Sequence, residues 1–476
     1  GAGSTVAVVG DALTNQGSGT IAVNAGTLNG ITTLTNSSTN GTAITVVSGS
    51  TLGFTTLNSS AGTVTSAGTL DGNVALTGAA VLDLNNGAIT GTLNNQSTSA
   101  ITLAGTVTGA ITQNNAAAST TIDGVTTLTG GFTNTAGTIT VAAATTLGTA
   151  SSNAGTLDIN ANILGGQTLT NTGTVTLAGA ITGSLAQTAG TTTVDGVSSV
   201  SGGIDIDGGA LTVNAATTSN IDVASAAIYD QNAAVTGNVT TASTNADISA
   251  NITGNLAQTA GATVVSGNSG FSGITDIQAG SFTVGTGTTL TVGDAATAQN
   301  ELTLQSGASL TVGQNATLAT NQTADSMTFA SGSTLTLLQG STLNGTSLLN
   351  GALVAQASGT TINSNVALQA SSTINMADGT AFNALTVNGT LTGSGGIVSL
   401  DVDLNAGGQA DRIVATGSGI SSGTVQIALN DLTTAGSYGA IGASGLVLLD
   451  LDVGSTVTAS ISGALPQDNQ NVYVYF

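Results

Sequence analysis

The chain has 476 residues, a formal charge of −22 and one basic residue, Arg412, and it contains no His, Lys, Cys or Trp. This composition argues against nucleic-acid binding and against attachment to anionic lipid, because both depend on Lys and Arg. It also excludes disulfides and the usual serine, cysteine and metalloprotease sites, which need Cys, His or Lys. We therefore expect a protein that is not an enzyme.

The chain starts with GAGSTVAVVG, which lacks the charged first segment of a signal peptide. We expect Gly1 to follow a processing boundary. No apolar run reaches the roughly 18 to 20 residues of a membrane-spanning helix, so we expect no direct membrane insertion. Hydrophobic residues make up 40% of the chain, which argues against disorder.

A motif of an aliphatic residue, Thr or Ser, and then Gly returns at multiples of about 18 residues, a period typical of short-repeat proteins. It begins at Ile89, Val107, Leu128, Ile181, Val200, Val235, Ile252 and, with an aromatic residue in first place, Phe271. A longer repeat is superimposed on it, because TTIDGVTTLTGG (120–131) recurs as TTVDGVSSVSGG (192–203). The offset between these two segments equals four of the short units, so the two periods agree. A short fixed period indicates a solenoid.

Short alternating segments such as GTITVAAATTLG (137–148) favour half-buried strands bounded by turn residues. Three such strands fill about 18 residues, which is one coil of a parallel β-helix, and coils stack about 4.8 Å apart. The sequence therefore predicts an all-β fold, a right-handed parallel β-helix that spans residues 1–392. We expect Val, Ile, Leu and Ala to fill an interior too narrow for aromatic rings.

Paired aspartates in aliphatic strands are the main candidates for chemistry. They are Asp205 with Asp207, Asp401 with Asp403, and Asp450 with Asp452. Each pair should place both carboxylates on one strand face about 6.5 Å apart. The favoured interpretation is a solvated face with the aliphatic residues inward. Weak Ca²⁺ binding at Asp205 and Asp207 and a glycosidase-like acid pair stay open, and Asp222 follows Asp205 by about one coil.

Thr-x-Thr steps suggest a further surface function, because rows of Thr on a flat solenoid face can match an ice lattice. The residues concerned are Thr140, Thr176, Thr291 and Thr336. All four lie in ordinary alternating segments whose intervening residues suit a core, so strand packing is the favoured interpretation.

From about Gly393 the short Thr- and Gly-rich repeats end, and the chain there resembles the C-terminal part of pertactin-like autotransporter passenger domains. The matching residues are Gly407-Gly408-Gln409-Ala410-Asp411-Arg412-Ile413-Val414, Gly417, Gly423-Thr424-Val425, the Tyr438 segment and Asn471-Val472-Tyr473-Val474. The segment LTNQGSGTIAVNAGTLNG (13–30) is similar to passenger repeats in a less specific way.

The resemblance implies that residues 393–476 form the last β-helix coils and a β cap that assists folding outside the outer membrane. It implies a structural role in this cap for Gly408, Asp411, Arg412 and Gly417. The family's translocating barrel has no counterpart in the sequence, so we expect a released passenger or a part of a longer protein.

Together these features predict a non-enzymatic extracellular protein of the bacterial cell surface, exported through the outer membrane and then released or attached. We expect it to act in adhesion, self-association or filament formation, with itself or a surface glycan or protein as partner. A coat protein of the S-layer kind linked by Ca²⁺, and a carbohydrate-binding or carbohydrate-active β-helix, are the alternatives. Apart from this Ca²⁺, no cofactor is expected.

Overall fold

The computed structural model describes residues 5–294, 296, 299–322, 325–349, 351–355, 359–405, 408–417, 421–433 and 446–462. The chain falls into two compact units, Gly1–Ile228 and Tyr229–Phe476. Every regular secondary-structure element in the described ranges is a β-strand. None of these ranges contains a helix long and apolar enough to cross a membrane. The all-β class predicted from the sequence is confirmed.

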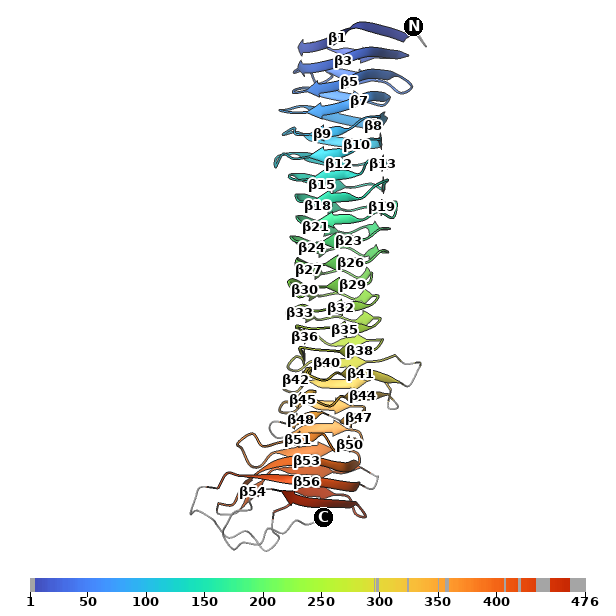
Figure 1. Ribbon diagram of the computed structural model, residues 1–476. Helices are drawn as coiled ribbons and strands as arrows, with labels where there is room; N and C mark the ends of the chain where they lie inside the picture. Colours follow the sequence, from blue (N-terminus) through green and yellow to red (C-terminus); the bar gives the residue numbers. More distant parts are fainter. Residues whose placement is uncertain are drawn as a thin grey trace. The chain divides into compact units, whose positions relative to one another are not determined.

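The first unit is a stack of strands, as Figure 1 shows, and the strands pair in parallel. Its strands are β1 Thr5–Gly17, β2 Ile21–Val23, β3 Thr27–Ser38, β4 Ile44–Val46, β5 Thr51–Ser59, β6 Thr63–Ser66, β7 Thr69–Leu76, β8 Val81–Ile89, β9 Leu93–Asn95, β10 Ala100–Val107, β11 Ile111–Gln113, β12 Ser119–Ile122, β13 Thr126–Leu128, β14 Phe132–Asn134, β15 Thr138–Val141, β16 Thr145–Leu147, β17 Ser151–Asn153, β18 Thr156–Ile159, β19 Ile163–Leu164, β20 Leu169–Asn171, β21 Thr174–Leu177, β22 Ala180–Ile181, β23 Leu185–Gln187, β24 Thr191–Val194, β25 Ser198–Val200, β26 Ile204–Ile206, β27 Gly209–Val213, β28 Thr217–Thr218 and β29 Ile221–Val223.

Each strand from β12 to β26 pairs with the strand three places further along the chain, so three strands make one turn. Sheet A contains β12, β15, β18, β21, β24 and β27, sheet B contains β13, β16, β19, β22, β25 and β28, and sheet C contains β11, β14, β17, β20, β23, β26 and β29. Among the earlier strands, β2, β4 and β6 extend sheet A, whereas long strands such as β8 and β10 bend from sheet A into sheet B.

The second unit repeats this arrangement. Its strands are β31 Val235–Thr236, β32 Val239–Thr241, β33 Asn245–Ile248, β34 Ile252–Thr253, β35 Leu256–Gln258, β36 Ala262–Val265, β37 Ser269–Phe271, β38 Thr275–Ile277, β39 Ser281–Val284, β40 Thr289–Val292, β41 Asn300–Leu304, β42 Ser309–Val312, β43 Thr317–Thr320, β44 Ser326–Phe329, β45 Thr334–Leu337, β46 Thr342–Asn344, β47 Thr346–Leu349, β48 Ala352–Ala355, β49 Thr360–Asn363, β50 Val366–Leu368, β51 Thr373–Asn375, β52 Ala384–Val387, β53 Leu391–Asp403, β54 Gln409–Ala410, β55 Arg412–Ala415, β56 Ser422–Asp431, β57 Leu449–Leu451 and β58 Thr456–Ser462, while β30 Ala227–Gln231 includes the division between the units.

Sheet D of the second unit contains β33, β36, β39, β42, β45, β48 and β51, sheet E contains β31, β34, β37, β40, β43, β46, β49, β52, β55 and β57, and sheet F contains β32, β35, β38, β41, β44, β47 and β50. The long strands β53 and β56 bend from sheet F into sheet D. All these pairings are parallel, whereas β54 pairs with β53 in antiparallel fashion. A parallel β-solenoid is therefore confirmed in both units, and a domain boundary at residue 393 stays a prediction.

The predicted turn length holds in one part of the chain and fails in another. Thr138 pairs with Thr156 and Thr156 with Thr174, so successive turns there have the predicted period. In the second unit, however, Phe282 pairs with Leu310, which makes that turn distinctly longer. The prediction is wrong for this turn because the connection from β40 to β41 is longer than those of the first unit.

The repeating motif marks a corner of the coil. Its aliphatic residue points into the core, as Val107 and Ile252 show with 0% exposure. Its glycine lies against the backbone of the previous turn. A Cβ atom at Gly109 would lie 2.5 Å from the carbonyl oxygen of Gly91, and one at Gly254 would lie 2.2 Å from that of Gly237. The motif therefore recurs at multiples of the turn length, at corners where a glycine leaves room for close contact with the previous turn.

A ladder of buried amides runs through the interior of the first unit, along the ends of β9 and of the sheet C strands that follow it. Its members are Asn95, Gln113, Asn134, Asn153, Asn171 and Gln187, all at most 1% exposed. The side-chain NH₂ group of each ladder residue donates a hydrogen bond to the side-chain amide oxygen of the next ladder residue, at 2.8–3.2 Å. Remaining donors reach backbone carbonyls such as that of Thr174, so the buried polar groups are satisfied.

Aromatic rings also enter the core, so the expected exclusion of large rings is wrong. Phe132 in the first unit is 2% exposed, and Phe271, Phe282 and Phe329 in the second are at most 1% exposed. Phe282 pairs with the smaller Thr263 on the preceding turn, and such a neighbour leaves volume for a ring.

Candidate functional sites

The acidic pair Asp205 and Asp207 lies on the outside of sheet C, at the end of β26. Both side chains are exposed and Ile206 between them is buried, as the alternating pattern predicted. Asp205 is in register with Asp222 on β29, so two like charges face each other on adjacent strands. Partial burial, and then the charges of Asp207 and Asp222, raise the pKa of Asp205 above its usual value.

Such a cluster gathers negative charge, but its side chains point into solvent. Within the described part of the chain, no three acidic side chains are grouped so as to hold a metal ion. Weak Ca²⁺ binding at Asp205 and Asp207 therefore stays a prediction.

The second acidic pair differs from its prediction, because Asp401 is buried at 0% exposure instead of facing solvent. Its Oδ2 atom accepts hydrogen bonds from the backbone N–H groups of Gly379, at 2.7 Å, and Thr380, at 3.1 Å. Its Oδ1 atom accepts one from the Asn430 side chain. The buried carboxylate therefore joins β53 to the loop after β51. Of the third pair, Asp450 is exposed, as predicted.

The residues of the predicted cap motif lie near Asp401. Asp411 is also 0% exposed, and its two carboxylate oxygens accept hydrogen bonds from the backbone N–H of Asn383, at 2.8 Å, and of Asp401, at 2.9 Å. Burial, with smaller contributions from the charges of Asp401 and Asp378, raises the pKa of Asp411 from 3.8 to about 6, although the two N–H groups oppose this shift. Asp411 therefore joins β53 to the loop before β52.

The other cap residues have different surroundings. Gly408 adopts a left-handed conformation with φ of 56°, and a Cβ at Gly417 would lie 2.5 Å from the backbone of Gly389. The Arg412 side chain is exposed, at the first residue of β55, and it lines a hollow of about 230 Å³ with Phe382 and Leu446. The Tyr438 segment, Gly407 and Asn471-Val472-Tyr473-Val474 lie outside the described residues.

A buried acidic pair that the sequence did not reveal lies between sheets E and F. Glu301, the only Glu of the chain, and Asp325 are both 0% exposed. Both oxygens of Glu301 and the Oδ1 atom of Asp325 are buried without a hydrogen-bond partner. Burial raises the pKa of Glu301, as do the charges of Asp325 and Asp294, whereas the dipoles of Gln299 and the Asp294 backbone lower it.

An outward row of threonines crosses sheet A of the first unit, with one residue per turn. This threonine row consists of Thr45, Thr65, Asp83, Thr102, Thr121, Thr140, Asp158, Thr176, Thr193 and Thr212, each partly exposed and in register with the next. Of the four Thr residues singled out in the sequence, Thr140 and Thr176 share this row, whereas Thr291 is in sheet E and Thr336 in sheet D.

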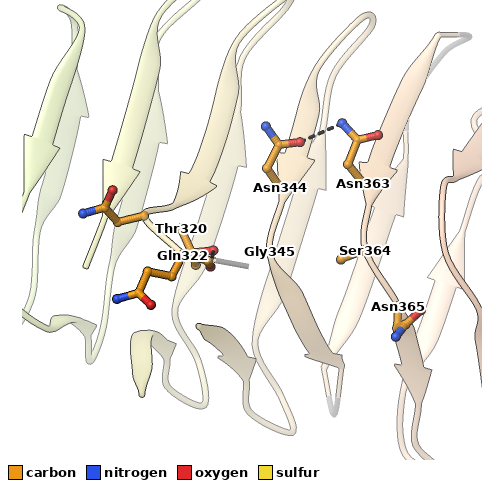
Figure 2. A pocket seen from close by; sticks show the side chains of 8 residues that line it. Thr320, Gln322, Asn344, Gly345, Asn363, Ser364 and Asn365 are labelled. Carbon is orange, nitrogen blue, oxygen red and sulfur yellow. Dashed lines mark hydrogen bonds between the residues drawn. The ribbon is translucent and has the colours of Figure 1, made fainter. Parts of the chain in front are cut away.

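A polar hollow of about 430 Å³ lies on the second unit, and Figure 2 shows the side chains around it. It is lined by Thr320, Asn321, Gln322, Asn344, Gly345, Asn363, Ser364 and Asn365. Its Asn344 accepts a hydrogen bond from Asn363, which in turn accepts one from Asn388. The lining offers amide and hydroxyl groups and no charged side chain.

Comparison with protein-family models and with curated proteins found no match. The assignment of the chain to a fold therefore rests on its parallel β-solenoid, and the resemblance to autotransporter passengers enters only as a proposal.

Proposed function

We propose that this protein is a non-enzymatic surface protein of the autotransporter-passenger kind, which acts by self-association. The observation that carries the proposal is the threonine row. Its positions are in register and place side-chain oxygens about 4.8 Å apart on one sheet face, the spacing of paired strands. Two such rows from separate chains can face each other with matching periods.

The chemistry of the row suits many weak contacts. A single neutral hydrogen bond contributes only about 0.5–1.5 kcal/mol net, so a useful interaction has to use several rungs together. Only Asp83 and Asp158 carry charge in the row, so the row itself adds little repulsion between two facing copies. Location outside the bacterial cell is part of the proposal. It is supported by the chain's single basic residue, since trypsin-like proteases would find almost no cleavage site.

The proposal is tested with a double charge substitution, Thr140→Glu with Thr176→Glu, in the middle of the row. The matched control is Thr133→Glu with Thr170→Glu, on the outward face of sheet C, where the residues are also partly or fully exposed. Sedimentation velocity over a wide concentration range should show assembly of the parent protein and of the control, and loss of assembly in the row variant. A parent protein that stays monomeric at high concentration, or equal assembly of both variants, would contradict the proposal.

Sugar binding is a second candidate, favoured by the polar hollow in Figure 2. Amide and hydroxyl groups are the partners that neutral sugars use, and Asn344 and Asn363 hold each other in a fixed orientation through a 2.7 Å hydrogen bond. A glycan array probed with the parent protein and with Asn363→Ala tests this candidate. If the parent protein binds no glycan, or if Asn363→Ala leaves glycan binding unchanged, the hollow is excluded as a sugar-binding site.

A further inference from the structure

The buried pair Glu301 and Asp325 is the strongest unexplained feature of the molecule. Glu301 is the extra residue of a β-bulge in β41, since Asn300 pairs with Ser326 and Leu302 with Met327. The bulge turns Glu301 inward beside the equally buried Leu302. Its carboxylate lies over Gly293, where a Cβ atom would meet the Glu301 side chain at 2.5–3.1 Å.

Asp325 comes to the same corner from the next turn, directly before β44. Its Oδ2 atom accepts a hydrogen bond of 2.9 Å from the backbone N–H of Gln322, which leaves Oδ1 without a partner. The Gln322 side chain in turn donates to the backbone oxygen of Asp294, at 3.3 Å. Two successive turns therefore bring two fully buried carboxylates, Glu301 and Asp325, to one corner.

No side chain of this protein can neutralise the pair. The chain has no Lys and no His, and its only basic residue, Arg412, is in β55. Along sheet E, β55 lies four strand spacings from β43, or roughly 19 Å. A buried carboxylate without a counter-charge is strongly unfavourable, so the compensating charge has to come from the solution.

We propose that Glu301 and Asp325 bind a divalent metal ion, with calcium as the preferred ion. Three oxygens are free to bind it: both of Glu301 and Oδ1 of Asp325. Calcium prefers carboxylate, carbonyl and water oxygens at about 2.3–2.6 Å and accepts bidentate carboxylates. A single proton would satisfy one of the three oxygens, whereas a metal ion can satisfy all three. This site is separate from the exposed pair Asp205 and Asp207.

The experiment compares the full chain with Glu301→Gln and Asp325→Asn, after treatment with EDTA. Titration with CaCl₂ in a calorimeter should give one binding site per chain in the parent protein. Loss of a residue that binds the ion directly should weaken binding at least about 10- to 100-fold, because loss of a residue that only orients such a ligand already has an effect of this size. The control variant Asp205→Asn should bind as the parent does, and MgCl₂ should compete poorly because Mg²⁺ demands stricter geometry.

Thermal unfolding supplies an independent measurement with the same proteins. In EDTA, Glu301→Gln should raise Tm above that of the parent, because it removes an uncompensated buried charge. In excess CaCl₂ the order should reverse, because only the parent gains stability from the ion. Absence of calcium binding by the parent overturns the proposal. So does calcium binding that Asp325→Asn and Glu301→Gln leave intact, or stability that depends on pH and not on calcium.

Discussion

Replacing Asn153 by Ala tests whether the amide ladder stabilises the first unit. Asn153 is 1% exposed and occupies the middle of the ladder. Its NH₂ group donates to Asn171 Oδ1, at 2.9 Å, and to the carbonyl of Thr174, at 3.0 Å, and its Oδ1 accepts from Asn134, at 2.8 Å. The substitution removes these three hydrogen bonds and a fourth, from the NH₂ group to the carbonyl of Gly155 at 3.1 Å, and leaves a cavity.

The expected loss follows from what each partner retains. Asn134 still donates to the carbonyl of Thr156, and Asn171 Oδ1 still accepts from the N–H of Gly173. These two partners therefore lose one bond each without becoming wholly unsatisfied. With about 1 kcal/mol per net hydrogen bond and a further term for the small cavity, we expect destabilisation of about 2–4 kcal/mol.

Urea unfolding followed by circular dichroism, with hydrogen exchange at residues 151–153 as a local measure, is the assay. The control is Ser152→Ala, because Ser152 is on the same strand but points outward, and it should change stability by less than about 0.5 kcal/mol. Asn153→Gln should restore part of the loss, since Gln113 and Gln187 occupy ladder positions on other turns. Equal effects of Asn153→Ala and Ser152→Ala would refute a stabilising role for the ladder.

Two further predictions concern the corners and the C-terminal acids. Gly109→Ala should destabilise the protein by about 2 kcal/mol or more, because its Cβ would lie 2.5 Å from a backbone oxygen, whereas Gly41→Ala, with open space around it, should be close to neutral in the same urea assay. The pKa of Asp411 is about 6 in the folded protein and 3.8 ordinarily, so the folded state holds the extra proton and stability should fall as pH rises from about 4 to 6. With allowance for solvent screening, the free energy of unfolding should fall by about 1–2 kcal/mol over this pH range. Asp411→Asn should remove this pH dependence. An unchanged pH profile in that variant would show that other groups cause the dependence.

The sequence predicted the solenoid because its period has a direct steric cause. Each turn has to pass the previous one at a corner, and glycines such as Gly109 and Gly254 leave the room for that passage. The alternation of inward and outward residues in strands such as β15 is equally local, and the structure confirms it. Both features recur at regular intervals along the chain, so a single sequence reveals them.

The amide ladder and the membership of the threonine row could not be predicted in this way, because both depend on the register between turns. An Asn at an alternating position suggests an exposed side chain, and Asn134, Asn153 and Asn171 are buried only because each one meets another amide on the next turn. A signal was present, since each of these residues stands two or three positions before a glycine. The inward turn of Glu301 had no such signal, because it depends on a bulge relative to β44.

The second unit has a single basic residue, Arg412, so its buried carboxylates have to be stabilised by other groups. Asp401 accepts hydrogen bonds from the backbone N–H groups of Gly379 and Thr380, and Asp411 accepts them from those of Asn383 and Asp401. The folded chain supplies these donors itself. At Glu301 neither buried carboxylate oxygen has a hydrogen bond of normal geometry, although the Gln299 side chain and the Asp294 backbone lie near enough to lower the pKa of the group. A chain that stabilises two buried carboxylates with its own backbone at one place, and leaves another bare, needs positive charge from the solution at the second place. That contrast within one unit is the reason to expect calcium at Glu301 and Asp325 and not at Asp401 and Asp411.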